Sequence, residues 1–179
     1  MILSPNDAEL FYDLIIPLAR YANKRYKIEP DAPDSDNPDA YPLEVIMSIT
    51  DYVWSNTKVI DQFLKTADLP DEHKLILTGW KRCLPGTYVI ERHLKRGSVF
   101  ISSDSSVYMV SGIMTPYSEM LPPGHLPATV RTVLLPFRGI IITSGLLSEY
   151  PVKLGAGYRG FFKDLYLDAK ANGKIIHSI

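Results

Sequence analysis

The periodicity of apolar residues changes near residue 84, and this change most constrains how the chain can fold. Before it, apolar side chains recur at three-to-four spacing, as in Leu10, Phe11, Leu14 and Leu18. After it, apolar and polar side chains alternate through residues 87–94. Helix-period sequence followed by strand-period sequence predicts an α+β protein rather than a series of βαβ units.

Residues 1–84 are expected to form a helical part. A first helix begins near Ser4 and Pro5, and Pro17 is expected to kink it or shift its boundary. Shorter helices are predicted over 43–54, 59–64 and 71–80, with their apolar and aromatic stripes in a core rather than around a cofactor. Residues 29–42 hold four prolines and five acids, which predicts a solvated acidic connector.

Residues 85–179 are expected to form a β-rich module with a C-terminal helix. Two hairpins are predicted, the first turning at residues 95–97 and the second at 136–139, with a further strand at 107–110. Residues 114–127 read as a proline-rich loop, and the last residues, 174–179, as a docked strand or a tucked tail. We predict a five-strand antiparallel sheet or small barrel, closed by the final helix and packed against the helical part as one compact unit.

Strict alternation along the first strand assigns its side chains to two faces. One face is expected to carry Tyr88, Ile90, Arg92 and Leu94, and the other Thr87, Val89, Glu91 and His93.

Charge is divided unevenly along the chain. Residues 1–72 hold 6 Lys and Arg against 14 Asp and Glu, whereas residues 73–179 hold 13 against 6. Such an asymmetry predicts two surfaces of opposite charge, which pair with each other or with other molecules.

Three stretches carry a resemblance to known proteins: Trp80 leading into GTYVIERHLKRGSVFIS, then TVLLPFRGIIITSGLL, then GAGYRGFFKDLYLDAKANGKIIHSI. In order and spacing they resemble a group of uncharacterised bacterial proteins, in some of which such a β-rich module is followed by a small SEC-C zinc motif. The resemblance covers roughly residues 70–179 and implies the β-rich architecture without an activity. The chain carries no cysteine cluster, so the resemblance implies no zinc site here.

The glycine-rich segment GAGYRG, residues 155–160, matches the spacing G-x-G-x-x-G before a predicted helix. The remainder of a dinucleotide-binding fingerprint is missing, because no buried parallel strand precedes it and no later strand supplies a ribose-binding acid. One interpretation is a tight loop, with a positive φ at Gly157. The alternative is an anion site, or a nucleotide or enzyme site, formed by Gly155, Gly157 and Arg159 at the helix start.

A second candidate is a basic surface around the first hairpin. Bases near Tyr88 and Phe100 could follow a nucleic-acid backbone and stack a base, whereas the moderate charge of the module favours internal or solvated complementarity. The residues of this candidate surface are Lys81, Arg82, Arg92, His93, Lys95 and Arg96.

Catalytic and metal-binding patterns are weak. Asp34, Asp36, Asn37 and Asp39 resemble a calcium loop, but proline, aspartate and valine stand where an EF-hand needs a ligand, glycine and glutamate. The single cysteine, Cys83, reads as a small buried hydrophobe rather than as a nucleophile paired with His73 or His93. The serines near Asp104 lack a supporting motif, and the histidines lack ligand spacing. We therefore expect no catalytic residue, metal ion or cofactor.

Function is expected to rest on binding. We expect a non-enzymatic interaction module of the bacterial cytoplasm, with a protein partner and no membrane segment, since one cysteine is typical of a reducing compartment and the apolar runs are short. Nucleic-acid association through the basic hairpin and small-anion or enzyme chemistry at GAGYRG are the alternatives.

Overall fold

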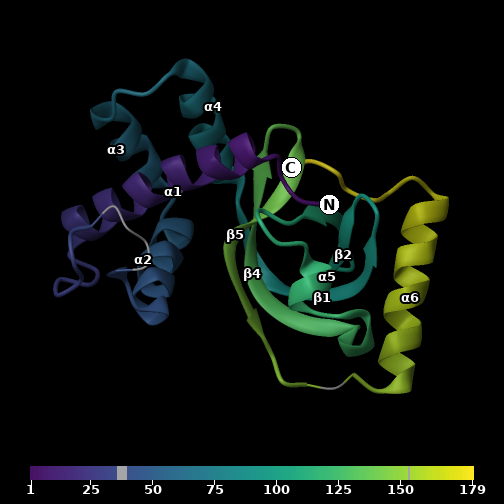
Figure 1. The fold of residues 1–179 in the computed structure, drawn as a ribbon. Helices are drawn as coiled ribbons and strands as arrows, with labels where there is room; N and C mark the ends of the chain where they lie inside the picture. The colour runs from purple at the N-terminus through teal and green to yellow at the C-terminus, as the bar shows by residue number, and fades with distance from the viewer. Residues whose placement is uncertain (36–39, 153) are drawn as a thin grey trace. The chain divides into compact units, whose positions relative to one another are not determined.

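The computed structural model describes residues 1–35, 40–152 and 154–179 and shows an α+β protein (Figure 1). Its internal contacts divide the chain into two compact units. The helical unit is Pro5–Cys83, and the barrel unit comprises Met1–Ser4 and Leu84–Ile179. The division lies beside the change of apolar period, although the barrel unit also includes the helix Ala156–Ala171. That the two units form one compact body stays a prediction.

The helical unit contains α1 (Pro5–Tyr26), α2 (Leu43–Ser55), α3 (Lys58–Thr66), α4 (Asp71–Gly79) and the short 3₁₀ helix η2 (Trp80–Arg82). Helix α1 runs through Pro17 without ending there, and that proline is exposed. The core of the helical unit contains a group of aromatic rings. The ring centroid of Trp80 lies 5.6 Å from that of Phe11 and 6.1 Å from that of Trp54. The apolar stripe of α1 therefore serves packing, as its spacing predicts.

The barrel unit contains β1 (Leu84–Leu94), β2 (Gly97–Ser102), β3 (Val107–Ser111), β4 (Ala128–Phe137) and β5 (Ile140–Glu149). Each strand pairs with two others, and the order β1-β2-β3-β5-β4 closes on itself. The expectation of a purely antiparallel sheet is wrong, because β3 and β5 pair in parallel through Val110–Ile141 and Ser111–Ile142. Strand β4 pairs with β1, so β5 returns along β3 in the same direction.

The expected loop over 114–127 contains two short helices, α5 (Tyr117–Met120) and η3 (Pro123–His125). Tyr117 and Leu121 are buried in the inner core with Tyr88, Ile90 and Phe100. The Tyr117 hydroxyl hydrogen-bonds Thr143 on β5 at 2.9 Å, and burial raises the pKa of Tyr117. Helix α5 thus contributes Tyr117, and the residue after it Leu121, to the inner core.

A β-bulge at Glu91 changes the faces of β1. Ile90 pairs with Phe100 and Arg92 with Val99, so Glu91 is the extra residue. Beyond it the alternation reverses, and the prediction that Arg92 and Leu94 share a face with Tyr88 and Ile90 is wrong. Leu94 packs in the outer cluster with Val99, whereas Tyr88 and Ile90 lie in the inner one.

Helix α6 (Ala156–Ala171) covers the outer side of the barrel, where Tyr166 and Ala169 pack with residues of β2 and β3 (Figure 1). The tail after it is docked along β3: Ile176 accepts from the Met109 amide at 2.9 Å and donates to the Val107 carbonyl at 2.8 Å. The first residues also join this unit, because Leu3 donates to the Gly112 carbonyl. Both chain ends therefore lie beside β3.

Candidate functional site

The GAGYRG segment forms the start of α6 rather than a strained loop. Gly155 is its N-cap with φ −67°, and Gly157 already lies within the helix without a positive φ. A Cβ at Gly157 would meet nothing within 4 Å. The interpretation of Gly157 as a positive-φ position is therefore wrong, because glycine here is not required by backbone geometry.

Arg159 has a local structural contact at this helix start. Its Nε donates to the Leu154 carbonyl at 3.0 Å, and its amide donates to the Gly155 carbonyl at 3.1 Å. The first contact joins the side chain to the segment that enters α6, and the second is a backbone hydrogen bond of the helix itself. An anion held by Gly155, Gly157 and Arg159 stays a prediction.

The six residues of the predicted basic surface are divided between the two units and differ in exposure. Lys81 and Arg82 belong to the helical unit, where Lys81 contacts both carboxylate oxygens of Asp61 at 2.7 and 2.9 Å. The other four belong to the barrel unit. Only Lys95 and Arg96 of those four are exposed, at the turn between β1 and β2.

Arg92 and His93 are held by the barrel itself. The Arg92 guanidinium forms a two-point ion pair with Glu91 and lies 4.2 Å from the Tyr166 ring centroid. Its charge therefore contacts a carboxylate on β1 and an aromatic ring on α6. The Glu91 carboxylate raises the pKa of Arg92. His93 contacts the Ser98 hydroxyl and the Leu121 carbonyl, each at 2.7 Å. Because a carbonyl only accepts, Nε2 carries the proton toward Leu121.

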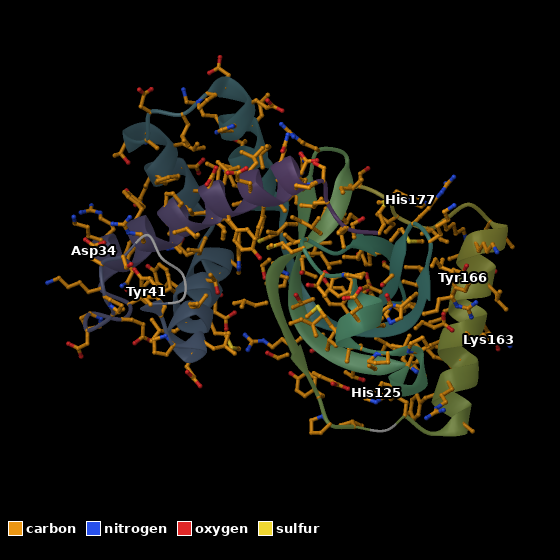
Figure 2. The ribbon with its side chains drawn as sticks, viewed as in Figure 1. Asp34, Tyr41, His125, Lys163, Tyr166 and His177 are labelled. Atoms are coloured by element: carbon orange, nitrogen blue, oxygen red, sulfur yellow. The ribbon has the colours of Figure 1, made fainter. Side chains whose placement is uncertain are left out.

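The uncovered start of α6 is the most distinctive surface of the barrel unit. Residues 155–161 are all exposed, including Tyr158 at 66% and Phe161 at 52%. Tyr158, Phe162, Tyr166 and Ala169 lie on one helix face, and burial begins only at Phe162. Figure 2 labels Tyr166 on α6 and Lys163 one turn before it. The apolar face that binds the barrel therefore continues beyond it into solvent.

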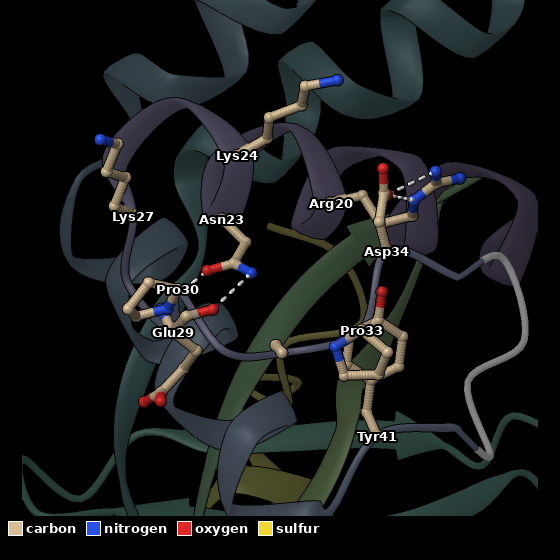
Figure 3. A pocket seen from close by; sticks show the side chains of 10 residues that line it. Arg20, Asn23, Lys24, Lys27, Glu29, Pro30, Pro33, Asp34 and Tyr41 are labelled. Carbon is tan, nitrogen blue, oxygen red and sulfur yellow. Dashed lines mark hydrogen bonds and ion pairs between the residues drawn. The ribbon is translucent and has the colours of Figure 1, made fainter.

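A polar pocket lies at the end of α1 and was not predicted from the sequence. It encloses about 320 Å³ between α1 and the described part of the connector, and it is shown in Figure 3. The Asn23 carboxamide bonds both backbone groups of Glu29, and Arg20 binds Asp34 at 2.7 Å. Figure 3 shows Lys24 and Lys27 extending outward. The spacing of Arg20 and Lys24 on one face of α1, with Lys27 directly after the helix, was the available signal.

The described residues of the connector are exposed or partly exposed, as predicted for a solvated segment, and several of them also form defined contacts. Tyr41 accepts from the Ser35 amide at 3.1 Å and donates to its carbonyl at 3.0 Å. The Arg20 guanidinium lowers the pKa of the Asp34 carboxyl through its hydrogen bond and its charge. Asp36, Asn37 and Asp39 of the calcium comparison lie outside the described residues. The pocket holds opposite charges that already pair, so it offers no single ligand chemistry.

Possible nucleophiles occupy structural positions. The Cys83 thiol is partly buried and donates weakly to the Trp54 carbonyl at 3.8 Å, and burial raises its pKa. The hydroxyls of Ser102 and Ser106 bond the Asp104 carboxylate, and the Ser102 hydrogen bond is the main reason that the pKa of Asp104 is lowered. This is a hydrogen-bonded turn between β2 and β3. Within the described ranges no group of three metal-ligating side chains occurs.

No helix in the described part of the chain is long and apolar enough to cross a membrane. Comparison with known protein families, curated proteins and solved structures gave no match for this chain.

Proposed function

We propose that this chain is a non-enzymatic interaction module whose protein partner binds the uncovered start of α6. The observation that carries the proposal is the exposed aromatic pair Tyr158 and Phe161, on a helix whose next turns are packed on the barrel. Val152, in the segment before the helix, is also 59% exposed. Large apolar side chains clustered in the open are typical of protein interaction sites.

The neighbouring charges indicate what kind of partner fits. Arg159 and Lys163 are exposed beside Tyr158 and Phe161, one turn apart on α6. Aromatic residues and arginine supply most of the binding energy at protein interfaces, with charged residues at the rim. We therefore infer a partner segment that presents apolar side chains flanked by Asp or Glu.

Helix geometry supports a rigid site. Tyr166 and Ala169 anchor the later turns of α6, so the exposed turns need no ordering when a partner binds. The Phe161 and Phe162 rings, 5.4 Å apart between centroids, also connect the exposed turn with the packed one.

A random peptide library displayed on phage tests this proposal. Binders of the whole protein are selected, with counterselection against the variant Tyr158→Ser/Phe161→Ser. We expect enriched peptides to combine apolar residues with flanking acids. Sequences that bind both proteins equally, or that lack acids, would contradict the proposal.

Self-association is the competing occupant of the same surface. Sedimentation of the wild type and the double variant distinguishes the two. We expect both to have the same mass. A wild-type dimer that Tyr158→Ser/Phe161→Ser dissociates would show that a second copy, rather than another protein, covers α6.

Nucleic-acid association is a second candidate, favoured by the closed order β1-β2-β3-β5-β4. Five-stranded Greek-key barrels of the OB type bind oligonucleotides on the face of strands 2 and 3 and on the β1–β2 and β4–β5 loops. In this chain those loops carry Lys95, Arg96 and Arg138. Such a likeness of architecture supports a function only through the residues at the site.

The outer face of β2 and β3 argues for the protein partner instead. Val99, Ile101, Val107 and Met109 on that face are buried with Tyr166 of α6, which leaves no open stacking platform on those four side chains. Fluorescence anisotropy with single-stranded DNA tests the alternative over a salt series. If nucleic acid binds here, the logarithm of the binding constant falls linearly with the logarithm of salt concentration. The magnitude of that slope should decrease by at most about three units in Lys95→Gln/Arg96→Gln/Arg138→Gln. We expect no binding at physiological salt, and micromolar binding lost in the triple variant would favour the nucleic-acid function.

A further inference from the structure

A small apolar pocket lies at the end of the barrel where both chain ends meet β3. It encloses about 240 Å³, and its lining comes from separate parts of the barrel unit. Met109 and Ser111 come from β3, Gly139 and Ile140 from the β4–β5 turn, and Arg96 from the β1–β2 turn. Met1 and His177 complete the lining.

Backbone hydrogen bonds hold the two chain segments that form the walls of this pocket. The Gly112 amide donates to the Met1 carbonyl at 3.1 Å, which holds Met1 beside β3. On the same strand the Met109 amide donates to Ile176, so His177 follows a docked residue. The pocket therefore has defined walls from two chain segments that are distant in sequence.

Within the described part of the chain, two polar groups of the lining are without a protein partner. Ser111 is only 2% exposed, and its hydroxyl has no hydrogen bond within residues 1–35, 40–152 and 154–179. In the same described ranges the exposed Arg96 guanidinium has no ion pair. Among the described residues the fully buried side-chain atoms without a hydrogen bond are Trp54 Nε1 and Trp80 Nε1, so the Ser111 hydroxyl, which lines the pocket, is not sealed off and is open to a group bound there.

The strand register brings these two groups close together. Ser98 pairs with Val110, so the next position on each strand sets Gly97 beside Ser111, and Arg96 directly precedes Gly97. A guanidinium and a hydroxyl at neighbouring positions are suited to the two oxygens of one carboxylate. The methionine and isoleucine side chains beside them are suited to an alkyl chain.

We propose that this pocket binds a small organic acid, with its carboxylate on Arg96 and Ser111 and its alkyl body on Met109 and Ile140. The site is independent of the α6 surface, since its lining contains no residue of that helix. The pocket volume lies just below the range for drug-sized ligands, so it admits a short chain rather than a long lipid.

Hexanoate is the probe, with acetate and hexylamine as controls, in an NMR titration of the whole protein near neutral pH. We expect hexanoate to shift the Arg96, Met109 and Ile140 signals with millimolar affinity and acetate to bind at least about tenfold more weakly, because acetate lacks the alkyl body. Hexylamine should not bind, because its charge repels Arg96. Equal binding of acetate and hexanoate, binding of hexylamine, or no hexanoate binding would overturn the proposal.

Two variants in the β1–β2 turn distinguish a direct contact of Arg96 with the carboxylate from general electrostatic attraction by the turn. Arg96→Gln should weaken hexanoate binding about tenfold or more, because it removes a charge-assisted hydrogen bond. Lys95→Gln removes the same charge one residue away, outside the pocket lining, and should leave the affinity unchanged. Equal effects of the two variants would contradict the assignment. Ser111→Ala should also weaken hexanoate binding, and an unchanged affinity would remove Ser111 from the site.

Discussion

Glycine has two different roles in the barrel unit. Gly97 begins β2 with φ +141°, and a Cβ there would lie 2.6 Å from the Val110 carbonyl oxygen of the adjacent strand. Gly157 has helical backbone and open space. Only the first position requires glycine, although the sequence pattern drew attention to the second.

Alanine substitutions test this contrast by urea unfolding. Gly157→Ala should raise the free energy of unfolding by about 0.5–1 kcal/mol, because alanine favours the helix. Gly97→Ala should lower it by at least about 1 kcal/mol, since both its φ and the close strand resist a side chain. A destabilised Gly157→Ala would contradict the open space and helical backbone at the start of α6.

The Asp34 carboxyl provides a pH-dependent prediction. Its pKa is lowered in the folded protein, so the stabilisation from its ion pair is present above the unfolded pKa and is lost as pH falls through the folded pKa. Arg20→Gln should raise the Asp34 pKa in an NMR titration. Lys24→Gln, which removes an equal but less influential charge, should raise it less. The reverse order would contradict the direct pairing.

Elements of the barrel unit were predictable where local pattern decides them. Alternation located β1, whereas short apolar runs between turn residues located the other strands and both hairpins, because β2 and β3 are buried on both sides. The bulge at Glu91 was not predictable, since an extra residue leaves the same local composition. The parallel pair of β3 and β5 was not predicted either, because pairing between residues as distant in sequence as Val110 and Ile141 depends on the whole barrel.

Candidate-site residues were less predictable than the elements. The sequence predicted Arg92 and His93 as surface bases. In the structure Arg92 stacks on Tyr166, and His93 hydrogen-bonds the Leu121 carbonyl. Both partners are distant in sequence. The exposure of Tyr158 and Phe161 was equally hidden, because their helical spacing is that of a buried face.

The attachment of α6 gives a prediction for a whole element. Tyr166 is buried between α6 and the barrel, so Tyr166→Ala should lower the free energy of unfolding by about 3–5 kcal/mol. The neighbouring Leu167 is exposed, and Leu167→Ala should change it by less than about 1 kcal/mol. Hydrogen exchange should show that α6 opens first in Tyr166→Ala. Equal stability of the two variants would mean that α6 is not held by this contact.

The two units of the molecule differ in charge as well as in structure. The helical unit holds 9 Lys and Arg against 14 Asp and Glu, whereas the chain from residue 84 onward holds 10 against 6. A modest positive charge on the barrel unit favours an acidic protein segment over the polyanionic backbone of nucleic acid, which usually requires a strongly basic surface. This preference agrees with the partner inferred for α6.

Calorimetric titration of a selected acidic and apolar peptide is the most direct measure of the proposed docking surface. Relative to wild type, Tyr158→Ser/Phe161→Ser should bind at least about tenfold more weakly, because aromatic anchors dominate such interfaces. Leu75→Ser, at a 72% exposed apolar side chain on α4, is the matched control and should bind like wild type. Wild-type affinity in the α6 variant, or an equal loss in Leu75→Ser, would contradict docking at the start of α6.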